Sequence, residues 1–194
     1  MTDDRDDIPQ GPRRTGEGRL PGDLGPQALV ERMIRVDHAG EYGAARIYAG
    51  QLAILGKAES APVIRHMAAQ EQRHLQTFDR LVVDRRVRPT ALSPVWHVAG
   101  FALGAASAIL GSRAAMACTA AVESVIDEHY AKQLSKLGED ETELRETIAE
   151  FRADEIEHHD TALAHDAERA PAFRPMSEAV KAGTRLAIWL SERI

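Results

Sequence analysis

Two glutamate–histidine pairs with identical spacing are the residues of this sequence best suited to chemistry. Each has the form Glu-x-x-His, and they span Glu71–His74 and Glu155–His158. A single glutamate precedes each pair, Glu41 by 30 residues and Glu123 by 32 residues. An isolated Glu-x-x-His pair is common on an ordinary surface helix. A functional site is indicated by the order of the whole set, in which a lone glutamate and a Glu-x-x-His pair occur twice in succession.

This set matches the ligand plan of di-iron and di-manganese carboxylate bundles. Residues three apart on a helix lie on one face, with Cβ atoms about 5–6 Å apart, so each pair can reach one metal region. A carboxylate has two oxygens, so Glu71 and Glu155 can each bridge two metals. The sequence therefore predicts a two-metal site with these six ligands: Glu41, Glu71, His74, Glu123, Glu155 and His158.

The ligand types favour iron or manganese. The chain has one cysteine, Cys118, which argues against a structural zinc site or an iron–sulfur cluster. Four carboxylates would balance two divalent ions, whereas four buried carboxylates without metal are costly unless they are protonated. The alternative is a solvated charged face. Gly40, Gly43 and Ala44 beside Glu41 argue against it, because small residues let another helix approach closely.

Three further residues are weaker candidates for the site. Asp154 lies one turn before His158 and can accept its second ring N–H. His129 and Tyr130 lie just over a turn after Glu123 and can also approach the metals. We predict no catalytic residue beyond the metal ligands. The remaining candidates are interpreted as surface or structural groups: His66, His97, Glu157, His159 and His165.

An internal repeat connects these residues. The stretch that begins at Glu41, EYGAARIYAGQL, resembles the stretch that begins at Glu123, ESVIDEHYAKQL. Both contain glutamate, then Tyr-Ala seven residues later, then Gln-Leu, and both are followed by a Glu-x-x-His pair. The repeat predicts a helix hairpin that occurs twice, with one lone glutamate and one pair in each copy.

Helical periodicity covers most of the chain, and no stretch alternates with the period of a strand. We expect an all-α fold of four long helices over 26–55, 62–86, 95–137 and 141–169. The Gly111-Ser112 dipeptide can interrupt the third. A shorter amphipathic helix over 176–194 follows Pro171 and Pro175.

The first 25 residues differ in composition from the rest. They are rich in Gly, Pro, Asp and Arg and lack the apolar segment of a secretory signal, so residues 1–25 are predicted to be a disordered tail. Residues 26–194 would form one domain. The net charge of −6 argues against a nucleic-acid-binding protein.

One uncharged segment, VWHVAGFALGAASAIL over Val95–Leu110, has 16 residues. A membrane span needs about 20. Core packing, contact with lipid and a channel for a lipid substrate all remain open for it. Leu186 and Trp189 of the last helix can add to such a surface.

Several longer stretches resemble the demethoxyubiquinone hydroxylase family of ubiquinone biosynthesis: DHAGEYGAARIYAGQLAILG, RVRPT, GFALGA, AMACTAAVES and EIEHHDTALAHDAE. The similarity runs from about Val30 to the C-terminal LAIWLSERI. It implies a ferritin-like four-helix bundle with two iron ions per chain. The family's iron ligands fall on the same six residues as those given above.

The resemblance also implies an activity and a location. Such an enzyme uses O2 to hydroxylate a 2-polyprenyl-3-methyl-6-methoxy-1,4-benzoquinol, which it collects from membrane lipid. It would be peripheral on the cytoplasmic face of a bacterial inner membrane, or on the matrix face of the mitochondrial inner membrane. A lipid-presenting accessory protein is an implied partner, and self-association stays open.

Two other functions fit the same fold, because a fold does not fix a function. One is a ferritin-like iron store or iron oxidase, although such proteins usually lack the second Glu-x-x-His pair. The other is a scaffold of quinone-synthesis assemblies, which would not need six ligands. A rubrerythrin-like peroxidase would carry a cysteine-rich iron domain, which this chain with its single cysteine lacks.

Overall fold

The computed structural model describes residue 22 and residues 24–194, and these residues are almost entirely helical, with no strand among them. The prediction of an all-α fold is confirmed. Apart from residues 22, 24 and 25, the predicted disordered tail lies outside the described residues. The six α-helices are α1 (Pro26–Leu55), α2 (Ala61–Asp84), α3 (Ser93–Ile109), α4 (Ser112–Leu134), α5 (Thr142–Ala164) and α6 (Phe173–Ser191).

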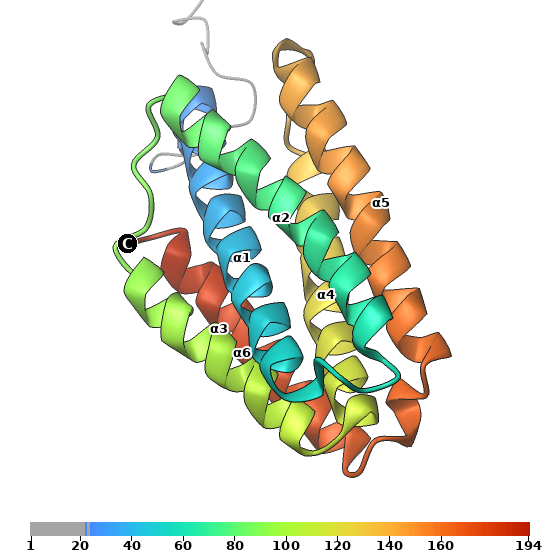
Figure 1. Cartoon of the computed structure of the whole chain (residues 1–194). Helices are drawn as coiled ribbons and strands as arrows, with labels where there is room; N and C mark the ends of the chain where they lie inside the picture. Colours follow the sequence, from blue (N-terminus) through green and yellow to red (C-terminus); the bar gives the residue numbers. More distant parts are fainter. Residues whose placement is uncertain (1–21, 23) are drawn as a thin grey trace, which may run out of the picture.

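Four of these helices form the bundle that carries the candidate ligands. Helix α1 packs against α2, and α4 packs against α5, so the chain contains the two hairpins that the repeat predicted (Figure 1). Helix α3, which follows the first hairpin in sequence, packs along α1 on the outer side of the bundle, and α6 returns along α4. The arrangement is a ferritin-like bundle with two added helices on one side.

The expected third helix is in fact two helices. It breaks after Ile109, and Gly111 adopts a φ of 105°, which glycine tolerates and other residues rarely adopt. This break turns the chain, so α3 packs on α1 whereas α4 enters the bundle. The expected helix over 141–169 ends at Ala164 because Asp166 adopts a left-handed conformation with a φ of 62°.

Close backbone contact joins α3 to α1. A Cβ atom added at Gly104 would lie 1.9 Å from the carbonyl oxygen of Ile47, and one at Gly50 would lie 2.2 Å from that of Phe101. Larger residues cannot fit there without moving a helix. Gly40 differs, because a Cβ atom on it would meet nothing within 4 Å. The expectation that Gly40 allows close helix packing is therefore wrong, and it lines a cavity instead.

Two apolar clusters occupy different levels of the bundle. One contains Tyr48, Ile64 and Met116, and the other contains Ile34 and Phe78 with several residues of α5. On each bundle helix the candidate ligands lie in sequence between residues of the two clusters. Apolar side chains therefore separate the candidate site from water at both ends of the bundle. In the described part of the chain, no helix is both long and apolar enough to cross a membrane.

Candidate metal centre

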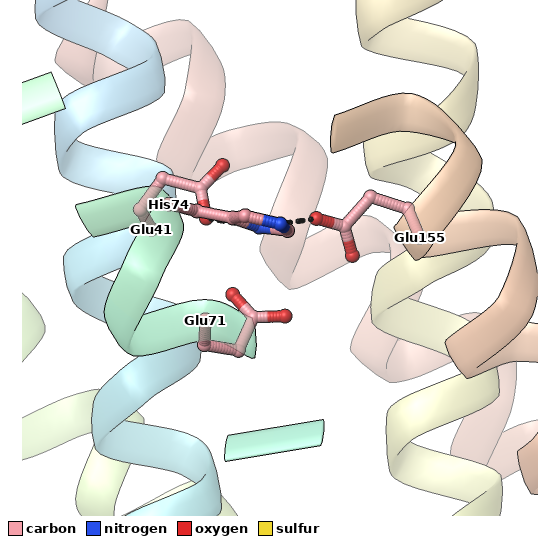
Figure 2. Close-up of side chains that lie close together, drawn as sticks. All are labelled: Glu41, Glu71, His74 and Glu155. Carbon is pink, nitrogen blue, oxygen red and sulfur yellow. Dashed lines mark ion pairs between the residues drawn. The ribbon is translucent and has the colours of Figure 1, made fainter. Parts of the chain in front are cut away.

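The structure brings all six predicted ligands together in the middle of the bundle. Each is at most 3% exposed, and four helices supply them: α1, α2, α4 and α5. Four of the side chains, from α1, α2 and α5, point toward a common centre in Figure 2. Those four are Glu41, Glu71, His74 and Glu155.

The candidate ligand atoms form two overlapping groups. In each group all atoms lie within 4.8 Å of one another. The first group contains Glu41, Glu71, His74 and Glu155, and the second contains Glu71, Glu123, Glu155 and His158. Glu71 and Glu155 belong to both groups, which is the position that a bridging carboxylate needs.

The atoms that face the centre lack hydrogen-bond partners. His74 Nδ1 lies 3.4 Å from Glu41 Oε2, and His158 Nδ1 lies 3.2 Å from Glu71 Oε1. Neither ring nitrogen makes a hydrogen bond, nor does Glu41 Oε2, Glu155 Oε2 or either carboxylate oxygen of Glu71. Buried polar atoms without partners are rare and costly. Metal ions would satisfy them, and carboxylate with imidazole is a suitable donor set for iron.

The outer ring nitrogen of each histidine does have a partner. His74 Nε2 lies 2.9 Å from Asp154 Oδ2, and His158 Nε2 lies 3.1 Å from Gln70 Oε1. These contacts leave both Nδ1 atoms for a metal. The prediction that Asp154 accepts the second ring N–H of His158 is therefore wrong, because Asp154 on α5 contacts His74 on α2 instead. Sequence reasoning missed Gln70, although Gln70 precedes Glu71 just as Asp154 precedes Glu155.

Two tyrosines cross between the halves of the repeat. Tyr48 Oη donates to Glu123 at 2.9 Å, and Tyr130 Oη donates to Glu41. The predicted proximity of Tyr130 to the site is confirmed. Tyr48 was missed, but it is the residue of the first copy that matches Tyr130. Each hydroxyl orients the glutamate of the other copy, so the two hairpins depend on each other.

His129, the other weak candidate, also lies near the centre. Its Nε2 is 3.2 Å from Asp37 Oδ1, and Gln133 Nε2 donates to the same oxygen at 2.7 Å. Asp37 and His129 line a small cavity of about 20 Å³ together with Glu41 and other ligands. His129 is therefore adjacent to the centre, and its ring contacts Asp37 and Gln133 rather than a candidate ligand.

Burial and like charge perturb the titration of the ligands. Burial, together with the neighbouring glutamates, raises the pKa values of Glu71 and Glu123 well above the ordinary range, and burial also raises the pKa of Glu155. Burial alone would lower the pKa of His74, but the carboxylates of Glu155 and Glu41 raise it to about 10. Burial lowers the pKa of His158. Without metal, the centre therefore retains protons.

An apolar cavity of about 370 Å³ adjoins the ligand cluster. It lies between α1, α3, α4 and α6, and its walls are apolar or small side chains. Val36, Gly40 and Ile188 line both this cavity and the small one that contains the ligands. Exposed Ala99 and Gly183 stand at its outer rim, so the cavity opens at the molecular surface and its inner wall adjoins the centre.

Comparison with known proteins identifies the family. The family model for ubiquinone biosynthesis protein COQ7 matches residues 28–191. This chain belongs to the COQ7 family. The match covers all six helices except Pro26 and Gln27 at the start of α1, so it includes α3 and α6 as well as the four helices that carry the candidate ligands.

Relatives of this COQ7-family chain carry related names. A protein of Rhodospirillum rubrum named 3-demethoxyubiquinol 3-hydroxylase is 59% identical over 183 residues, 94% of this chain and 86% of the relative. The Homo sapiens NADPH-dependent 3-demethoxyubiquinone 3-hydroxylase, mitochondrial, is 54% identical over 87% of this chain and 79% of its own length. The Saccharomyces cerevisiae 5-demethoxyubiquinone hydroxylase, mitochondrial, is 44% identical over 86% and 79%.

The raised carboxyl pKa values predict how the stability of this COQ7-family chain without metal depends on pH. The folded chain holds protons on Glu71, Glu123 and Glu155 at pH values where the unfolded chain has lost them. The free energy of unfolding should therefore fall as pH rises above the ordinary glutamate pKa of about 4.3. Between about pH 6.5 and pH 8, we expect the melting temperature to fall by several degrees, at about 2–4 °C per kcal/mol.

The control is Glu71→Gln, which removes one titrating group and should reduce this slope. Bound Mn(II) should reverse the slope, because the metal binds the deprotonated ligands. The melting temperature of the metal-free chain is the measurement. An equal or higher melting temperature at the higher pH would contradict the assignment of protons to the buried glutamates.

Proposed function

We propose that this chain is a di-iron monooxygenase that hydroxylates demethoxyubiquinol, a 2-polyprenyl-3-methyl-6-methoxy-1,4-benzoquinol, with O2 in ubiquinone biosynthesis. The observation that carries the proposal is the contact between two features: an unpartnered carboxylate–histidine cluster and an apolar cavity that leads to it. Family membership and the names of the relatives support a hydroxylase rather than an iron store or a scaffold.

In this proposal the six residues divide between two irons. Glu41 and His74 would hold one iron, Glu123 and His158 would hold the other, and Glu71 and Glu155 would serve both. The irons supply the binding and reduction of O2 when they are present. One oxygen atom enters the quinol ring as a hydroxyl group and the other leaves as water. This stoichiometry needs two electrons and two protons from an external reductant.

The apolar cavity would hold the quinol ring. Its volume of about 370 Å³ lies within the range of small-molecule sites. Gly40 and Gly43 leave room beside Glu41, so a flat ring can lie close to the centre. The walls offer few polar atoms, which excludes water from the ring and from the ligands. The polyprenyl chain would leave past Ala99 and Gly183 at the rim.

The exposed faces of α3 and α6 beside this rim are apolar. Helix α3 buries its small residues against α1, and it exposes Val98 at 66% and Ile109 at 70%. Helix α6 exposes Leu186 at 56% and Trp189 at 51%. Trp96 Nε1 donates to Ser191 Oγ at 3.0 Å and joins the two helices across the cavity. The segment over Val95–Leu110 therefore has one face in the core and one outside it.

We infer that this apolar surface attaches the chain peripherally to a membrane, where a polyprenyl quinol dissolves. Burial of apolar surface contributes about 25 cal/mol per Å² removed from water. Arg193, whose guanidinium lies over the Trp189 ring, places a cation next to the surface for lipid phosphates. The expected location is the inner membrane, on the mitochondrial matrix face or the bacterial cytoplasmic face. A lipid-presenting accessory protein and self-association also remain predictions.

The function is tested by filling the cavity. Iron-loaded protein with a reductant and O2 should convert a short-chain demethoxyubiquinol into its hydroxylated product, detected by mass spectrometry. Ala187→Phe, which narrows the cavity, should lower kcat/KM at least about tenfold, equivalent to about 1.4 kcal/mol. Iron content should not change, because Ala187 is neither a candidate ligand nor a residue of the small cavity at the centre.

The matched control is Ala182→Phe, which adds the same ring to an exposed position of α6 outside the cavity. It should retain wild-type turnover. Absence of any hydroxylated quinol from the iron-loaded wild type would refute the proposed function. Equal losses in both variants would refute the assignment of the cavity as the ring site.

The membrane attachment has its own test. Replacing Val98 and Leu186 together by serine should reduce flotation with liposomes of anionic and neutral lipid, and it should reduce turnover of a long-chain substrate. Turnover of a short-chain analogue should be retained. The control is Val83→Ser, which removes a side chain that is 73% exposed on α2, a helix that packs against neither α3 nor α6. Unchanged flotation of the double variant would contradict the proposed surface.

A further inference from the structure

The residues that contact the metal ligands follow the two-fold repeat in position but not in chemistry. Each histidine directs Nε2 to the residue that precedes the bridging glutamate of the other pair. For His74 this partner is the carboxylate of Asp154, at 2.9 Å. For His158 it is the neutral amide of Gln70, at 3.1 Å. Equivalent positions therefore differ by one negative charge.

The residues four positions before the two lone glutamates also differ in charge. Asp37 lies four residues before Glu41, and Thr119 lies four residues before Glu123. Repeat-related glutamines donate to both: Gln133 Nε2 to Asp37 at 2.7 Å, and Gln51 Nε2 to Thr119 at 3.2 Å. The hydrogen-bond pattern is thus preserved while a carboxylate replaces a hydroxyl. Both departures from symmetry place the carboxylate on the side of Glu41 and His74.

Basic side chains beside these carboxylates offset the difference only in part. Arg73 contacts Asp154, but the Arg73 side chain is 52% exposed and solvent screens its charge. His129 contacts Asp37, and its ring is 14% exposed. The position in the second pair that corresponds to Arg73 is Glu157, which is exposed. The two carboxylates that distinguish the halves are more buried, with side chains 17% exposed for Asp154 and 0% for Asp37.

We propose that the two metal positions are inequivalent, and that the position of Glu41 and His74 binds a divalent ion first and more tightly. The inference rests on the two-metal centre proposed above. A carboxylate that accepts the outer N–H of a ligating histidine makes the ring a more basic donor. The Asp154 carboxylate beside His74 also places a negative charge near the ion, which stabilises the positive charge of the ion. The position of Glu123 and His158 would fill second.

An anaerobic calorimetric titration with Fe(II) tests this order. Two binding steps alone do not decide it, because repulsion between the ions separates the steps even at a symmetric site. The variants decide it. Asp154→Asn keeps the shape and an acceptor oxygen but removes the charge. If the Asp154 side fills first, this variant should weaken the first step by about 10–100-fold.

Gln70→Glu adds the missing charge to the other half. If that half fills second, Gln70→Glu should strengthen the second step and leave the first nearly unchanged. The control is Asp79→Asn, which removes the partner of His38, a histidine outside the ligand set, at 3.0 Å. It should alter neither step. Asp154→Glu, which restores a carboxylate, should recover most of the first-step affinity.

The opposite pattern would overturn the inference. If the two positions were equivalent, the first ion would bind to the unaltered half of the Asp154→Asn variant, so only the second binding step would weaken. In Gln70→Glu the first ion would bind to the half with the added charge, so the first binding step would strengthen. Thermal melts of each metal-free variant identify any loss caused by unfolding. Binding of one ion or none by the wild type would instead refute the proposed two-metal centre itself.

Discussion

The burial of four carboxylates and two imidazoles at one level of the bundle is the constraint on which the rest of the structure depends. Six of their polar atoms make no hydrogen bond, so the centre must hold either protons or metal ions. Tyr48 and Tyr130 each donate to a glutamate of the opposite hairpin and so position the carboxylates before any ion binds. Apolar clusters on both sides exclude water, which strengthens every electrostatic interaction within the centre.

The two helices outside the bundle add an apolar cavity beside the candidate metal centre. Backbone contact at Gly104 holds α3 against α1, and Trp96 joins α3 to α6 through Ser191. Between these contacts the helices leave an apolar cavity rather than a filled core. An iron store has no need of such a cavity. A hydroxylase that must bring a quinol ring to the metals and keep its tail in lipid needs both the cavity and the apolar surface around it.

Much of this arrangement is predictable from the sequence, because helix geometry and the repeat are local properties. The spacing of Glu71 and His74 predicts a shared helix face, and the duplicated motif predicts the opposite hairpin. The contacts of Asp154 are different, because its partner depends on how α2 and α5 cross. The same crossing gives Gln70 its role, which no single-helix pattern contains. The cavity depends on the turn at Gly111 and on where α6 returns, and neither position can be derived from periodicity.

The central claim is that Glu71 and Glu155 are shared by two ions. The most direct measurement is the metal content and magnetic coupling of protein reconstituted anaerobically with Mn(II), by elemental analysis and electron paramagnetic resonance. We expect two ions per chain with an exchange-coupled spectrum, and loss of the coupled signal with much of the metal in Glu155→Ala. One uncoupled ion per chain in the wild type, or full retention of the coupled pair in Glu155→Ala, would contradict the account.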